Sequence, residues 1–128
     1  GLHSTLTDGQ ATFEDYIRRG KEIGLDAVAI TEHAADQSSY DFEAYARSKA
    51  RLQELAWPMN LYLAAEVKLA SPDGTLDLRP ERRALVDFVV GVLHSYPDGQ
   101  GGFIFPKKLD RQTDLEMDFR LAQALIQN

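Results

Sequence analysis

The stretch that most constrains the fold is the apolar run 27–30, which leads into the polar triplet Thr31-Glu32-His33. The run is continuous rather than alternating, which is typical of a strand buried on both faces of a parallel sheet. In α/β folds with parallel strands, ligands bind just beyond the carboxyl ends of those strands. The sequence therefore predicts a strand over 27–31, with Glu32 and His33 at a functional edge.

The segments around this strand alternate between helical and strand patterns, which predicts an α/β fold. Pro58 ends one helical pattern, and the turn at 71–74 has proline and glycine where a tight turn needs them. The expected elements are a helix capped by Thr12 and stopped by Gly24, a helix over 40–56 capped by Ser38 or Ser39, strands at 61–69 and 88–93, a hairpin strand at 75–78, a loop over 99–106, and a final helix capped by Thr113 that buries an apolar face including Leu115, Phe119 and Leu121.

Polar side chains gather at the ends of the expected strands. All three histidines of the chain, His3, His33 and His94, stand in such places, and Asp8 follows His3 closely. Glu66 lies within the apolar strand at 61–69, where an unpaired carboxylate would be costly. Imidazoles mixed with carboxylates suit Zn, Mn or Fe. The pattern therefore predicts a metal site at this edge.

Each of these residues also has a simpler interpretation. A single histidine is more often a surface or structural residue than a ligand, and Asp8-Gly9 alone is a turn signal. Glu66 would face water if its strand lay at the edge of the sheet. Glu32 would serve by orienting His33 or its neighbour rather than by binding a metal itself.

Charge and composition exclude several classes of protein. The net charge of −6 and the pI near 5 give no strong nucleic-acid signal, although bound metal can make an anionic substrate acceptable. There is no cysteine, and no apolar run has a membrane-spanning length. We expect one cytoplasmic domain over 1–128, with the arginines at 79–83 and the lysines at 107–108 as solvated faces.

Four segments resemble the PHP (polymerase and histidinol phosphatase) domain family. The segment 3–9, His-Ser-Thr-Leu-Thr-Asp-Gly, resembles the second half of the family's first motif. The segment 24–33, which ends in Thr-Glu-His, resembles the second motif, where Thr-Asp-His is more usual. Ala65-Glu66-Val67 with Asp73-Gly74 resembles the family's Gly-x-Glu segment and hairpin, and 89–95 resembles a strand that ends in a ligand histidine.

The resemblance implies a metal-dependent phosphoesterase, similar to histidinol phosphatase. In the family, a metal-bound hydroxide attacks the phosphoester of a small phosphorylated substrate, and two or three divalent ions (Zn, Mn or Fe) take part. The positions that match the family's metal ligands are His3, Asp8, His33, Glu66 and His94, of which His33, Glu66 and His94 are the expected catalytic residues.

The resemblance also implies the fold: the N-terminal half of a distorted (β/α)7 TIM-like barrel, with parallel strands and a β-hairpin after the third strand. The family's first ligand histidine would fall at Gly1, and no histidine follows His94. We expect a truncated PHP-type domain over 1–128, for which a second half-domain or an oligomer partner would close the barrel. Open strand edges otherwise favour aggregation or pairing.

Two other functions stay open. The chain could be a non-catalytic PHP-like structural or regulatory module of a larger protein, which a later Asp-x-His in the parent reading frame would argue against. It could also be another metal-dependent, amidohydrolase-like barrel, which faster turnover of carbon–nitrogen substrates than of phosphoesters would support.

Overall fold

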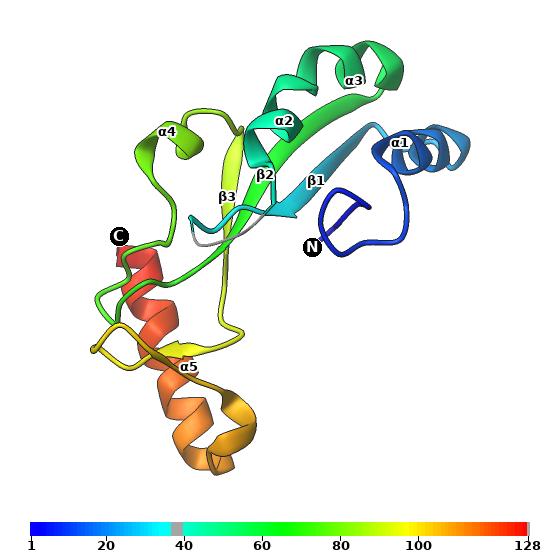
Figure 1. Ribbon diagram of the computed structural model, residues 1–128. Coiled ribbons are helices and arrows are strands. Elements are labelled where there is room, and N and C mark those ends of the chain that lie inside the picture. The colour runs from blue at the N-terminus through cyan, green and yellow to red at the C-terminus, as the bar shows by residue number, and fades with distance from the viewer. Residues whose placement is uncertain (37–39, 128) are drawn as a thin grey trace. The chain divides into compact units, whose positions relative to one another are not determined.

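The computed structural model describes residues 1–36 and 40–127 of the chain (Figure 1). It divides into two compact units. The first comprises Gly1–Glu66 and Leu78–Val90, and the second comprises Val67–Asp77 and Gly91–Asn128. Each unit has its own buried residues. Within the described residues, no helix has both the length and the apolar character needed to cross a bilayer.

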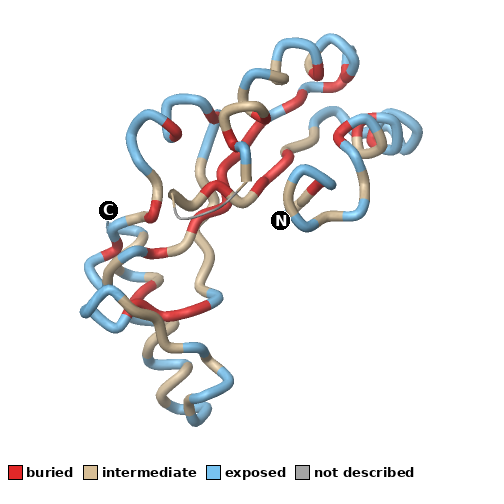
Figure 2. The backbone as a smooth tube through the Cα atoms, in the orientation of Figure 1, coloured by how far each residue is buried: buried red, intermediate tan, exposed pale blue. Residues whose placement is uncertain are grey.

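The first unit is built on a parallel sheet of three strands in the order β1-β2-β3. These strands are β1 (Ala27–His33), β2 (Asn60–Lys68) and β3 (Phe88–Val92). β1 continues through the polar triplet, so the prediction that the strand stops at residue 31 is wrong. Glu32 and His33 are the last two residues of a strand rather than the start of a loop. Buried residues follow one another along β1 and β2 (Figure 2).

Three helices cover this sheet, and local sequence explains where each begins. Thr12 caps α1 (Phe13–Glu22) in a reciprocal capping box with Asp15, as predicted, and Gly24 follows with a φ of 75°. The single helix expected over 40–56 is two helices, α2 (Phe42–Arg47) and α3 (Lys49–Ala56), which meet at Ser48. The predicted caps at 38–39 lie outside the described residues. Asp41 caps α2 by accepting a hydrogen bond from the amide of Ala44.

The short helix α4 (Pro80–Arg83) corrects the expectation of a solvated basic face at one position, since Arg79 and Arg83 are exposed as expected. Arg82 is buried. Its guanidinium forms two hydrogen bonds with Glu43 of α2, at 2.9 and 3.3 Å, and also donates to the carbonyls of Ala34 and Ala35. This arginine thus ties the segment that follows β1 to α2. Its planar fork suits several acceptors at once, which lysine does not.

The second unit is held by α5 (Arg111–Gln127), which packs against Leu69 and Tyr96. The predicted hairpin strand at 75–78 is only an isolated antiparallel bridge between Leu69 and Leu76. The expected loop over 99–106 instead contains β5 (Phe103–Ile104), which pairs with β4 (Tyr96–Pro97), and then the 3-10 helix η1 (Pro106–Lys108). Two-residue strands carry too short a pattern to be recognised in a sequence.

The final helix begins before the predicted cap. Asp110 accepts hydrogen bonds from both the amide and the hydroxyl of Thr113, so Asp110 has the capping role expected of Thr113. Leu121 is buried as predicted, whereas Leu115 and Phe119 are exposed. The helix has apolar residues on two sides, and only one side contacts the core of its unit.

Candidate metal centre

His33 and Glu66 lie side by side because β1 and β2 are parallel and in register. The register pairs His33 with Glu66 at the carboxyl ends of the two strands. Glu66 is 3 % exposed. The interpretation of Glu66 as an edge residue facing water is therefore wrong, since β2 is the central strand of the sheet.

The N-terminal segment brings His3 to the same place. Leu2 pairs with β1 through its carbonyl, which accepts from the Thr31 amide at 3.0 Å, and its own amide donates to Oγ1 of Thr31 at 2.6 Å. The ring of His3 stacks on that of His33, with centroids 4.1 Å apart and planes 8° from parallel. Tyr16 of α1 donates to the carbonyl of His3 at 2.8 Å and so fixes the backbone there.

Glu66 contacts both of the stacked imidazoles. Its Oε2 is 3.4 Å from Nε2 of His3, and its Oε1 is 3.5 Å from Nδ1 of His33. The other ring nitrogen of His33, Nε2, is 3.2 Å from Oδ2 of Asp8. A neutral imidazole has only one N–H, so His33 can donate to only one of these two carboxylates. At the other contact a ring lone pair faces a carboxylate, which is unfavourable and which a bound cation would relieve.

Asp8 is the most exposed member of the cluster. Partial desolvation acts to raise the pKa of its carboxyl, but the charge and hydrogen bond of His33 outweigh it, so that the pKa lies below its usual range. Asp8 is therefore an anion at neutral pH, available to a cation from the solvent side.

The donor set fits a divalent metal ion. One ligand atom from each of His3, Asp8 and His33 lies within 4.8 Å of the others. Two ligands at about 2.1 Å from one ion are at most about 4.2 Å apart, so only a small adjustment is needed. Among the described residues, Nδ1 of His3 is buried without a hydrogen-bond partner. The nitrogen and oxygen chemistry suits Zn, Mn or Fe.

Glu32 contacts the N-terminal loop. Its Oε1 accepts from the amide of Ser4 at 2.8 Å, and its Oε2 accepts from the hydroxyl of Thr7 at 2.5 Å. The sequence pointed to Glu32 as an orienting residue for His33 or its neighbour, and the partners found here are on the segment that carries His3 and Asp8.

His94 lies in the second unit, two residues after the end of β3, and is exposed. The cluster of His3, Asp8, His33 and Glu66 belongs to the first unit. The role of His94 as a ligand stays a prediction.

Two further residues shape the cluster, and sequence reasoning missed the first of them, Tyr40. The ring of Tyr40 stacks on that of His33 with centroids 6.2 Å apart. Gly9 is needed because a Cβ there would overlap the carbonyl of His3, where the loop closes on itself. The Asp-Gly pair was a signal for this turn, whereas nothing in the spacing of Tyr40 indicated a stacked ring.

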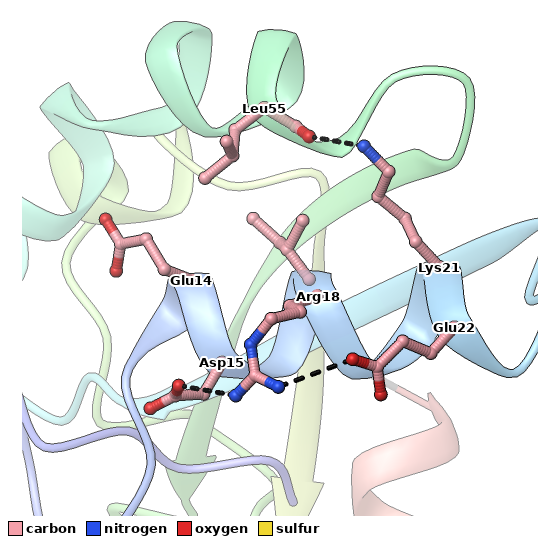
Figure 3. Close-up of a pocket in the computed structure, with 7 residues that line it drawn as sticks. Glu14, Asp15, Arg18, Lys21, Glu22 and Leu55 are labelled. Atoms are coloured by element: carbon pink, nitrogen blue, oxygen red, sulfur yellow. Dashed lines mark hydrogen bonds and ion pairs between the residues drawn. The ribbon is translucent and has the colours of Figure 1, made fainter.

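A hollow of about 640 Å³ lies elsewhere on the first unit, between α1 and α3 (Figure 3). Its charged walls are largely paired with one another: Arg18 bonds to Asp15 and Glu22, and Lys21 donates to the carbonyl of Leu55 at 3.2 Å. It contains no histidine. We regard it as a surface groove over the buried side chain of Ile17.

Fold and cluster together define an α/β protein with a candidate divalent-metal centre at the carboxyl ends of its strands. A family model described as PHP domain matches residues 2–127, so the chain belongs to the PHP domain family. PHP domains are known for metal-dependent phosphoesterase activity and generally bind divalent metals. No curated protein matches the sequence.

Proposed function

We propose that this chain hydrolyses a small phosphoester with the help of two or three divalent metal ions. The observation that carries the proposal is the cluster of His3, Asp8 and His33 around the buried carboxylate of Glu66. When bound, such ions supply an acidified water and neutralise the charge of the phosphoryl group. Cytoplasmic location, and His94 as a further ligand, remain part of this proposal.

The protein's own residues have distinct parts in this proposal. Glu66 is fixed in the central strand and faces both rings, so it holds two imidazoles in one orientation. His33 is fixed by the same sheet, whereas His3 and Asp8 come from the N-terminal segment. Asp8 is the ligand with the greatest access to solvent, and a substrate would approach from its side.

The test begins with the metal content of the purified chain, measured by plasma mass spectrometry. Hydrolysis of p-nitrophenyl phosphate is then followed before and after addition of Mn²⁺ or Zn²⁺. We expect at least one tightly held ion per chain and activity that depends on it. His33→Ala and His94→Ala should each lower metal content and activity far more than they lower stability.

Two outcomes would reject this proposal. Full metal content in both histidine variants would mean that these residues do not form the site. Tight metal binding without turnover of any phosphoester would instead support the second candidate, a non-catalytic structural or regulatory module. Gly1 favours that candidate, because it stands where the resemblance places the family's first ligand histidine and offers no ligand atom, and a Cβ there would overlap Thr31 Oγ1 and Glu66 Oε2.

For the fold, we propose the first half of a distorted (β/α)7 barrel, completed by a second half-domain or an oligomer partner. Its support is β3, an apolar strand whose residues are only half-buried or exposed. Light scattering at several concentrations tests the oligomer alternative. A monomer at all concentrations would leave only the second half-domain, whose addition in trans should then raise metal affinity and activity.

A further inference from the structure

Two of the candidate ligands are carried by a segment that is not part of the sheet. His33 and Glu66 are held by paired strands, but His3 and Asp8 lie on either side of a tight turn. Within this turn the carbonyl of Ser4 accepts from the amides of Thr7 and Gly9, at 3.0 and 2.9 Å. These bonds set the shape of the turn. They do not set where it lies relative to β1.

The backbone of Leu2 pairs with β1 just before the turn, and the side chain of Glu32 connects the turn itself to β1. It reaches from β1 into the turn, where one oxygen accepts from the Ser4 amide and the other from the Thr7 hydroxyl. Both Glu32 and Ser4 are 1 % exposed, so the bond between them is shielded from water, and the bond to half-buried Thr7 is partly shielded. Hydrogen bonds to a charged acceptor are stronger than those between neutral groups. A buried donor that loses its hydrogen bond also lowers the stability of the fold.

We propose that Glu32 is a positioning residue that fixes the turn against β1 and thereby holds His3 and Asp8 beside His33. This inference rests on the proposed metal centre. Consecutive residues of a strand project to opposite faces of the sheet. His33 therefore belongs to the cluster directly, whereas Glu32 contacts the turn that carries His3 and Asp8. Oε2 of Glu32 is 3.9 Å from Nδ1 of His3, too long for a hydrogen bond. Glu32 therefore acts through the turn.

The most selective test is Thr7→Val, which leaves every candidate ligand in place and removes the bond to Glu32, together with a long contact of 3.5 Å between the Thr7 hydroxyl and Oδ1 of Asp8. We expect the affinity for Co²⁺, titrated as the metal alone, to fall about 10- to 100-fold, as is typical when a group supporting a metal ligand is lost. Thr5→Val is the matched control, because it makes the same chemical change at an exposed position of the same turn and should leave affinity unchanged.

The route through the turn is tested by a double-mutant cycle. In a chain that already carries His3→Ala and Asp8→Ala, Thr7→Val should weaken Co²⁺ binding no further, because the ligands it positions are gone. An equal loss of affinity in both backgrounds would overturn the proposal, since Glu32 would then act on His33.

A second measurement needs no metal. Hydrogen exchange of the Ser4 and Gly9 amides in the metal-free chain should speed up in Glu32→Ala. Glu32→Gln should restore much of the protection, because its amide oxygen can accept from Ser4 while its nitrogen donates to Thr7. Unchanged exchange in Glu32→Ala would overturn the positioning role. A wild-type chain that takes up no Co²⁺ would instead reject the proposed function, so the two failures are distinct.

Discussion

The two units of the chain bury different chemistry. The second unit is closed by an apolar cluster around Leu69, Tyr96 and Leu121, and it buries one carboxylate, that of Asp77, among its described residues. The first unit also has an apolar core, but at one end of its sheet it buries Glu32 and Glu66 together with Ser4. Burying carboxylates is unfavourable unless they are paired or bind a cation.

This difference separates stability from function in the chain. In the second unit, a buried apolar side chain stabilises the fold because its surface is removed from water and because it packs closely against its neighbours. In the first unit, burial of the carboxylates is unfavourable for stability. Their burial is explained by the groups that they position, which are the imidazoles beside Glu66 and the turn beside Glu32. Substitutions in the two units should therefore affect different measurements, and the predictions below use that contrast.

The largest loss of stability is expected from Leu121→Ala in the second unit. Leu121 is 5 % exposed and contacts the apolar cluster, so its truncation leaves a cavity. We expect the free energy of unfolding, measured in urea, to fall by about 2–5 kcal/mol. Leu115→Ala on the exposed side of α5 is the control and should cost less than about 0.5 kcal/mol. Equal losses at both positions would mean that α5 does not pack as described.

Glu66→Gln should have the opposite effects, a large loss of metal affinity and little change in the free energy of unfolding. The two side chains have the same shape, but the amide cannot accept from both imidazoles and is a poorer metal ligand, so metal affinity should fall by about 10- to 100-fold. The metal-free chain should keep its free energy of unfolding or gain a little, because a buried charge is removed. Titration with Mn²⁺ and urea unfolding measure the two effects. Glu81→Gln, at an exposed position of α4, is the matched control.

A large loss of stability in metal-free Glu66→Gln, with no change in metal affinity, would reverse this interpretation. Glu66 would then be a structural residue whose charge is balanced by His3 and His33.

The core of the candidate site was predictable because its polar residues end or interrupt apolar strands. Glu66 in an apolar strand, and His33 at the end of another, are anomalies in a short pattern, and the parallel register brings them together. The break at Ser48 was not predictable, because both helices there continue one periodic pattern. The burial of Arg82 depends on Glu43 and on two carbonyls distant in sequence, and composition gives no sign of such contacts.

A smaller effect is expected from Tyr96→Phe in the second unit. The hydroxyl of Tyr96 is 2.5 Å from Oδ1 of Asp114 and 2.7 Å from Oδ1 of Asp118, and burial together with these carboxylates raises the pKa of the phenol. Without the hydroxyl, the two carboxylates lose the donor that they share. We expect a loss of about 1 kcal/mol in urea. Tyr62→Phe, an exposed tyrosine of β2, should cost nothing measurable.

If Tyr96→Phe stabilises the chain, the close approach of two carboxylates to one hydroxyl is repulsive, and α5 is held by its apolar contacts alone.

The smallest effect, and the only one tied to pH, is expected at Asp73 in the turn at 71–74. Its carboxylate accepts from the hydroxyls of Ser71 and Thr75 and from the Thr75 amide, which lowers its pKa to about 2. The folded chain then binds fewer protons than the unfolded chain between about pH 2 and pH 4, so stability from this group rises with pH in that window and is constant above it. The thermal unfolding midpoint of Asp73→Asn should therefore differ from that of wild type by a constant amount above about pH 4, and the difference should vanish toward about pH 2.

Because the Asp73 carboxylate is exposed, the effect on stability is small. A difference that persists at the acid end would mean that the turn is stabilised by the shape of the side chain rather than by its charge.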